Sequence, residues 1–277
     1  MLENIQFLAV PIIACVLLAG MLAYFGNHIL TRGIIFIDIA LAQIAALGTM
    51  IGILLGFADE SFSVEAVSMI FTLVVISLFA LTKFEKQRIP QEAIIGIIYG
   101  LSLGIAMLFA EYIPGGSNYI TKTITGNILW CTWGHLKSCF LTFAAIGIVH
   151  IFLGRHFIKI SEAKDRFPFS PKKVRILELV FYITFGTVIV KAVPVGGIFL
   201  VFTLLIAPTS IATLFTRRWR YRFIWSWLIG IIGSVAGMVI SYNLDISNGP
   251  AIVCLLGLLV FILAFGKIVF GKSKRIA

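Results

Sequence analysis

Asp38 is the residue of this sequence whose setting most clearly points to chemistry. It is a carboxylate flanked by Ile37 and Ile39, about one helical turn inside a long apolar stretch. An ionised side chain in hydrocarbon costs about 2.5–3.5 kcal/mol, so such residues usually line a cavity or pair with a partner. Two interpretations stay open: a place on a substrate path that binds a cation, or a structural pair with Arg32 or a hydrogen bond at the helix end.

Gln43 follows Asp38 by five residues in the same apolar stretch. At about 100° per residue, the two side chains are about 140° apart around a helix. They therefore do not share a narrow face, and a single metal ion bound by both would require an irregular helix. From the residues alone, only Asp38 is a candidate for a substrate path.

The remaining reactive side chains show no catalytic or metal-binding spacing. His28, His150 and His156 stand alone near basic residues, which is typical of structural hydrogen bonding. The four cysteines form no CxxC pair and indicate apolar packing, with a disulfide left open for one pair near the outer face, Cys131 and Cys139. No GxxxxGK[ST] phosphate loop occurs, so we do not expect the chain to be an ATPase or another enzyme.

These residues must be positioned by membrane-spanning helices. Of the 277 residues, 60% are hydrophobic and 12% are charged, and the mean hydropathy is +1.06. That composition excludes a soluble enzyme, a nucleic-acid-binding domain and a disordered chain. We predict an all-α polytopic integral membrane protein that forms one domain over residues 1–277.

Nine apolar segments are long enough to cross the roughly 30 Å hydrocarbon core of a bilayer. They cover about residues 7–25, 34–56, 64–82, 91–112, 136–153, 175–193, 195–214, 222–243 and 247–266. The separation between the sixth and seventh is the weakest, because only Val193-Pro194-Val195 and a glycine pair mark it. The apolar second half of the connection 113–135 is expected to dip into the membrane.

The basic residues predict the orientation. With nine spans, 19 of the 22 Lys and Arg lie on alternate connections, and only Lys122, Lys137 and Lys191 lie on the other side. Cytoplasmic connections are the basic ones, so the N-terminus is predicted outside and the C-terminus inside. The outer side then carries more acidic than basic residues, which either attracts a cationic cargo or merely keeps the loops soluble.

Small residues recur every three or four positions in two of the predicted helices. Gly96, Gly100 and Gly104 fall on one helix face, and Gly230, Gly233 and Gly237 do the same in a later helix. Absent side chains let a neighbouring backbone approach closely, so both rows are expected to pack tightly against other helices.

Several short segments occur in an order and spacing that cover about residues 7–266. They are Gly26 to Gly48, Ala93-Ile94-Ile95-Gly96, Thr125-Gly126-Asn127-Ile128-Leu129, Val195-Gly196-Gly197-Ile198-Phe199-Leu200, Leu204-Leu205-Ile206-Ala207-Pro208, and Ser241-Tyr242-Asn243-Leu244-Asp245 with Ser247-Asn248-Gly249-Pro250. In this series the chain resembles the permease subunits of zinc, manganese and iron ABC importers.

The resemblance implies a subunit of the bacterial cytoplasmic (inner) membrane that dimerises to form a pore. It implies alternating access powered by two copies of a separate ATPase subunit, and a metal-binding protein outside the membrane that delivers the cargo. A divalent metal is then the transported substrate, ATP binds the partner, and no cofactor is expected in this chain. The partners are the lipid bilayer and these proteins, and no nucleic acid.

The long basic inner connection, 154–174, corresponds in this resemblance to the segment that contacts the ATPase. The residues expected to make the contact are Ser161, Glu162, Lys164, Asp165 and Arg166. Pro168 departs from the short helix that is usual in the family.

A second departure lies around Asp38. The usual family pattern is Gly-Asp-Ala-Leu-Ser-His followed by Leu-Pro-Gly, and its Asp and His are implicated in metal passage. Alignment on Gly48 puts Gln43 at the His position and Ile39 at the Asp position, with Asp38 one place early. The resemblance therefore implies Asp38 and Gln43 as candidate pathway residues, with Asp38 as the candidate metal ligand. An amide oxygen is a poorer zinc ligand than imidazole. Alternatives therefore stay open: an ABC permease for a metal chelate or another cargo, or an ion-coupled secondary transporter.

Overall fold

The computed structural model describes all residues except 1, 60, 82–89, 127, 164–168 and 272–277. The described part is all-helical. It contains α1 (Leu2–Arg32), α2 (Ile37–Leu54), α3 (Phe62–Leu81), α4 (Gln91–Ala110), α5 (Gly116–Thr125), the 3-10 turn η1 (Ile128–Trp130), α6 (Trp133–Glu162), α7 (Pro171–Phe215), α8 (Trp219–Leu244) and α9 (Asn248–Gly271).

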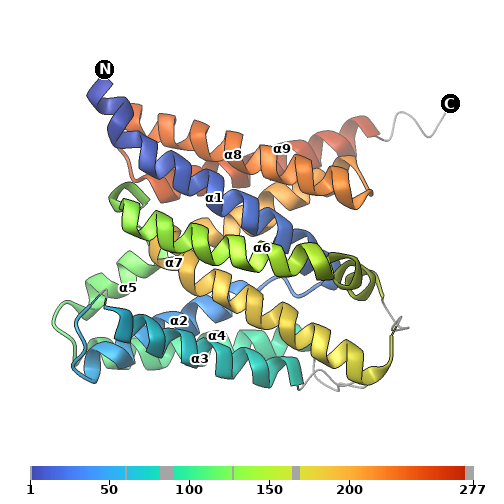
Figure 1. Cartoon of the computed structure of the whole chain (residues 1–277). Coiled ribbons are helices and arrows are strands. Elements are labelled where there is room, and N and C mark those ends of the chain that lie inside the picture. Colours follow the sequence, from blue (N-terminus) through green and yellow to red (C-terminus); the bar gives the residue numbers. More distant parts are fainter. Residues whose placement is uncertain (1, 60, 82–89, 127, 164–168, 272–277) are drawn as a thin grey trace.

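Eight of these helices are long and apolar enough to cross a membrane, which confirms the polytopic all-α class. They run side by side across the view in Figure 1, so that the ends of α1 and α6 and the beginnings of α7 and α8 gather at the right. The helices overrun the predicted spans at several ends. α1 continues to Arg32 and α6 to Glu162, so His28 and His156 lie in helices and not in loops as predicted. Hydropathy detects only the hydrocarbon layer, whereas backbone hydrogen bonding continues into polar turns beyond it.

The 45-residue α7 consists of two helical halves. Gly197 has φ 74° and ψ 164°, which no helix allows. On one side of this break, Phe181 lies with its ring centroid 5.4 Å from that of Phe25 in α1. On the other side, a Cβ on the neighbouring Gly26 would lie 2.0 Å from the Leu205 carbonyl oxygen. The two halves of α7 thus pack beside the same turn of α1, so the chain reverses direction at Gly197.

The connection before α6 folds back onto this reversal. Gly126 has φ 73°, and a Cβ there would lie 2.1 Å from the Gly196 carbonyl oxygen. A Cβ on Gly197 would in turn lie 2.2 Å from the Gly126 amide nitrogen, and one on Gly249 would lie 2.5 Å from the Thr125 carbonyl oxygen. Only glycine fits where three backbones meet this closely. The segment expected to dip inward therefore forms α5 and η1 and packs on α7.

The two glycine rows behave differently. A Cβ on Gly233 or Gly237 would lie 2.3 Å from Leu256 or 2.7 Å from Ile252, so α8 and α9 pack closely as predicted. The row in α4 does not pack against any described helix of this chain. Nothing lies within 4 Å of a Cβ on Gly96, Gly100 or Gly104, so this face is open in the described part of the chain. Both rows have the three- or four-residue spacing of one helix face, and this spacing does not say whether a neighbour is present.

Candidate functional site

Asp38 lies in the first turn of α2 and is 1% exposed. Its oxygen Oδ1 has no hydrogen-bond partner among the described residues. The predicted alternative, an ion pair with Arg32, does not form. Arg32 instead donates through Nε to Ser161 Oγ at 2.9 Å, and its Nη1 lies 3.8 Å from Glu178 Oε1. Asp38 is thus a buried carboxylate with one oxygen open, close to the positive end of the α2 dipole.

The turn before Asp38 is held by a carboxylate from another helix. Glu92, in the first turn of α4, accepts a hydrogen bond from the backbone N–H of Ile35 at 2.7 Å. The sequence suggests only that Glu92 favours the dipole of its own helix, so its role in the 33–36 turn was not foreseeable. Glu92 therefore joins the beginnings of α2 and α4 and helps to place Asp38.

Gln43 is buried farther along α2 and lines a narrow pocket of its own. The pocket lies between α2, α4 and α5, and Tyr119 and Thr123 of α5 line it as well. Burial raises the pKa of the Tyr119 hydroxyl above its ordinary value, so this hydroxyl is neutral at physiological pH. Asp38 does not line this pocket. The structure thus confirms that both residues are buried on α2 but does not bring them into one site.

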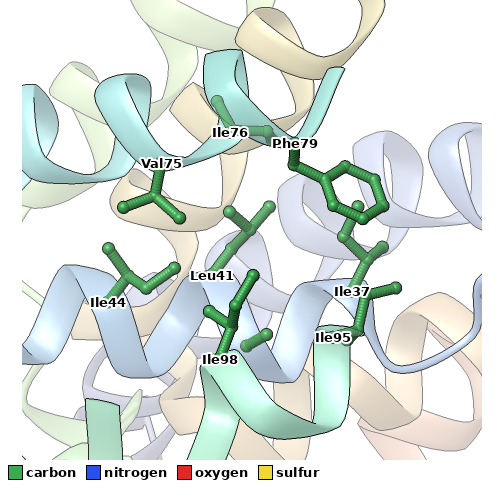
Figure 2. Close-up of a pocket in the computed structure, with 9 residues that line it drawn as sticks. Ile37, Leu41, Ile44, Val75, Ile76, Phe79, Ile95 and Ile98 are labelled. Atoms are coloured by element: carbon green, nitrogen blue, oxygen red, sulfur yellow. The ribbon is translucent and has the colours of Figure 1, made fainter. Parts of the chain in front are cut away.

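A second pocket lies between α2, α3 and α4 and is entirely apolar. Figure 2 shows the side chains that converge on it, among them Ile37 and Leu41 of α2, Phe79 of α3 and Ile95 of α4. It contains no oxygen, nitrogen or sulfur ligand, so it can hold a hydrocarbon group but no metal ion.

No group of three or more His, Cys, Asp or Glu side chains that could hold a metal occurs within the residues that the structure describes. Cys131 and Cys139 are free thiols, so the disulfide left open by the sequence is not formed. Burial raises the pKa of the Cys131 thiol, which keeps it protonated and unreactive. Among the described residues, Asp38 Oδ1 and Glu92 Oε2 are buried carboxylate oxygens without a hydrogen-bond partner, and neutral oxygens line the pocket around Gln43.

Two of the residues predicted to contact an ATPase are described. Ser161 is buried and Glu162 is exposed, and they are the last two residues of α6. Ser161 Oγ lies 2.8 Å from His28 Nδ1, and the Glu162 carboxylate accepts a hydrogen bond from Trp219 Nε1. Lys164, Asp165 and Arg166 lie outside the described residues.

The structure also reveals buried polar contacts, of which the sequence predicted only the structural hydrogen bonding of His150. Arg222, at the start of α8, donates to Asn27 Oδ1 and to Thr31 Oγ1 of α1, each at 2.8 Å. His150 of α6 contacts the Tyr24 hydroxyl at 3.0 Å and Thr184 Oγ1 at 2.8 Å. In the sequence Arg222 is one of four arginines within six residues, and nothing distinguishes it from the exposed ones. Only the packing of α8 on α1 makes it internal.

Comparison with known proteins gives a consistent result. Residues 4–267 match the sequence profile of the ABC 3 transport family. The chain is 26% identical over 194 residues to the manganese transport system membrane protein MntB of Synechocystis sp., covering 68% of this chain and 61% of that protein. It is 24% identical over 201 residues to the chelated iron transport system membrane protein YfeD of Yersinia pestis, covering 70% and 65%.

The chain thus spans about three fifths of the length of curated relatives such as MntB. Among solved structures, the fold is similar to that of a chain in PsaBC from Streptococcus pneumoniae in complex with Fab. The TM-score is 0.76 at 18% identity, and the match covers 95% of this chain and 93% of that chain.

The family profile covers nearly the whole chain, and the helical arrangement agrees with it. The resemblance seen in the sequence is thereby confirmed. This chain belongs to the ABC 3 transport family.

Proposed function

We propose that this chain is the membrane-spanning permease subunit of an ABC importer for a divalent metal ion, in the manganese, iron and zinc class. The observation that carries the proposal is the family match over residues 4–267 together with the buried, open carboxylate of Asp38. A carboxylate oxygen without a partner in a membrane helix attracts a cation, and it repels an anionic cargo.

The proposed assembly has two copies of this chain, two ATPase subunits at the cytoplasmic face and a metal-binding protein at the outer face. The chain would lie in the bacterial inner membrane as one domain and carry no cofactor of its own. ATP would bind the ATPase subunits and not this chain. The chain would supply only the path through the membrane. Glu162, Lys164, Asp165 and Arg166 are the proposed contact with the ATPase. Ser161, which the resemblance groups with them, is buried against α1.

We propose nine crossings, with the N-terminus outside and the C-terminus inside. The reversal at Gly197 supports this count, because each half of α7 then crosses the membrane once. The distribution of Lys and Arg over alternate connections supports the orientation.

Alternating access would arise from rigid movement of helices when the two ATPases close on ATP. Asp38 would take up the metal ion from the outer side and release it when the path opens inward. A single carboxylate binds a divalent ion weakly, which suits a site that must also release its ion.

Metal accumulation in cells that carry the complete transporter tests the proposal. Asp38→Asn keeps the shape of the side chain and removes its charge, and we expect it to lower uptake by about tenfold or more. Asp59→Asn, at an exposed turn, is the matched control and should keep wild-type uptake. Elemental analysis of zinc, manganese and iron, normalised to the amount of the chain in the membrane, gives the result. Equal metal contents with and without the wild-type chain, in depleted and replete media, would refute the importer.

A permease for a metal chelate is the second candidate. The observation in its favour is that Gln43, Tyr119 and Thr123 offer neutral hydrogen-bonding groups in place of the imidazole usual in the family. Uptake of an iron chelate but of no free metal ion, with Asp38→Asn unaffected, would favour this candidate.

A further inference from the structure

The last two residues of α6 are tied to two other helices. Ser161 Oγ lies 2.9 Å from Arg32 Nε and 2.8 Å from His28 Nδ1, both on α1. Glu162 accepts a hydrogen bond from the indole N–H of Trp219, the first residue of α8. The end of α6 therefore cannot move without displacing α1 and α8 or breaking these bonds.

The bonds to Ser161 are buried, and Arg32 has few alternatives to them. The side chain of Arg32 is 4% exposed, and its two terminal guanidinium nitrogens have no hydrogen-bond partner among the described residues. Its other contacts are Glu178 Oε1 at 3.8 Å and the ring of Phe181, whose centroid lies 3.9 Å from the guanidinium carbon. A buried donor that loses its acceptor is costly, so the Arg32–Ser161 bond resists separation.

Ser161 also joins the two α1 side chains to each other. Because Arg32 donates to its oxygen, the Ser161 hydroxyl is free to donate its own hydrogen to Nδ1 of a neutral His28. His28 is fully buried, and its Nε2 has no hydrogen-bond partner in the described residues. The hydroxyl of Ser161 thus links α6 to both His28 and Arg32 of α1.

Arg32 is the last residue of α1, and the connection to α2 is short. Gly33 has φ 71°, and four residues separate Arg32 from Ile37, where α2 begins. The turn is stiffened by the bond from the Ile35 amide to Glu92. Asp38 follows at once as the second residue of α2. A displacement of Arg32 therefore moves the first turn of α2.

We infer that Arg32 and Ser161 are positioning residues that transmit movement of the cytoplasmic end of α6 to Asp38 through the 33–36 turn. The inference rests on the proposed function, because it takes the α6 end as the place where ATPase movement arrives. It adds a route from that place to the metal path: Ser161 on α6, Arg32 on α1, then the turn and Asp38 on α2. Neither residue touches the metal in this role.

The test measures metal uptake and ATP hydrolysis together. The complete transporter, with its ATPase and binding protein, is reconstituted in proteoliposomes, and radioactive manganese uptake is compared with phosphate release. Ser161→Ala removes the linking hydroxyl, and we expect metal moved per ATP hydrolysed to fall by about fivefold to tenfold, with ATP hydrolysis largely kept. Ser234→Ala is the matched control, because that hydroxyl is fully buried and donates to Gly230 O in its own helix.

Arg32→Gln and the double variant complete the test. If both residues act in one link, the double variant has a metal-to-ATP ratio no lower than the worse single variant; independent roles would make the reductions multiply. Should Arg32→Gln fail to reach the membrane, Ser161→Ala decides alone. An unchanged ratio in Ser161→Ala, or an equal loss of uptake and ATP hydrolysis, overturns the inference. If the wild-type transporter takes up no manganese, iron or zinc, the proposed function is refuted instead.

Discussion

At the scale of single residues, the notable feature is that α2 places Asp38 and Gln43 in different surroundings. Asp38 has an ionisable carboxyl group and lies in the first turn, whereas Gln43 cannot ionise and lines a pocket with residues of α4 and α5. The family pattern named above would place an imidazole where Gln43 stands. A change at Gln43 should therefore alter which metal passes more than how fast metal passes, because the carboxyl group of Asp38 remains.

Gln43→His is expected to shift selectivity toward zinc. Imidazole is a much better zinc ligand than an amide, so the ratio of zinc to manganese uptake should rise about fivefold or more. The measurement is uptake from an equimolar mixture of the two metals, read by elemental analysis of the same cells. Gln43→Asn, which keeps the amide, should leave the ratio near the wild-type value. An equal change in both metals would contradict a role for Gln43 in selection.

At the scale of helices, backbone contact at glycines decides how the bundle closes. The segment containing α5 and η1 is held against the reversal of α7 by Gly126 and Gly197, both with positive φ. These contacts lie between backbones, which cannot rearrange as side chains do. The α4 row, by contrast, touches nothing in the described part of the chain, so it contributes no packing there.

Gly126→Ala should destabilise the fold and Gly100→Ala should not. An alanine at 126 meets both an unfavourable φ and a carbonyl oxygen 2.1 Å from its Cβ, so we expect a loss of at least about 1–3 kcal/mol. An alanine at 100 meets no atom within 4 Å and suits a helix better than glycine by about 0.5–1 kcal/mol. Thermal unfolding of the purified chain in detergent gives both values. Equal unfolding temperatures for the two variants would contradict a close backbone contact between Gly126 and the reversal of α7.

At the scale of the whole molecule, the reversal at Gly197 determines the topology. If α7 crosses twice, the residues after it return to the side on which α7 began. If α7 crossed once, the exposed arginines that follow it would lie on the other side. The proposed orientation depends on whether α7 crosses the membrane twice, because this decides on which side of the membrane every later connection lies.

Thiol labelling of two single variants tests this topology. Ser117→Cys, exposed in α5, should react with a membrane-impermeant maleimide in intact cells. Arg217→Cys, exposed just after α7, should react only once the membrane is made permeable. The unsubstituted chain, with its own four cysteines, is the background control. Labelling of Arg217→Cys in intact cells would favour a single crossing by α7.

Much of the fold was predictable from the sequence because burial in lipid imposes long apolar runs. Nine such runs correspond to α1–α4, α6, the two halves of α7, α8 and α9, and the family was recognisable from short segments. Asp38 stood out for the same reason, since a charge inside an apolar run is visible without any structure.

The partners of the polar side chains were decided only by the tertiary structure. Arg32, Ser161, Glu178 and Arg222 lie beyond or at the edge of the apolar runs, where exposed and buried charges look alike in a sequence. Likewise the glycines of α4 and α8 have similar spacing, yet only those of α8 have a neighbour. Periodicity shows which residues share a face of a helix, but what that face meets depends on how distant helices pack.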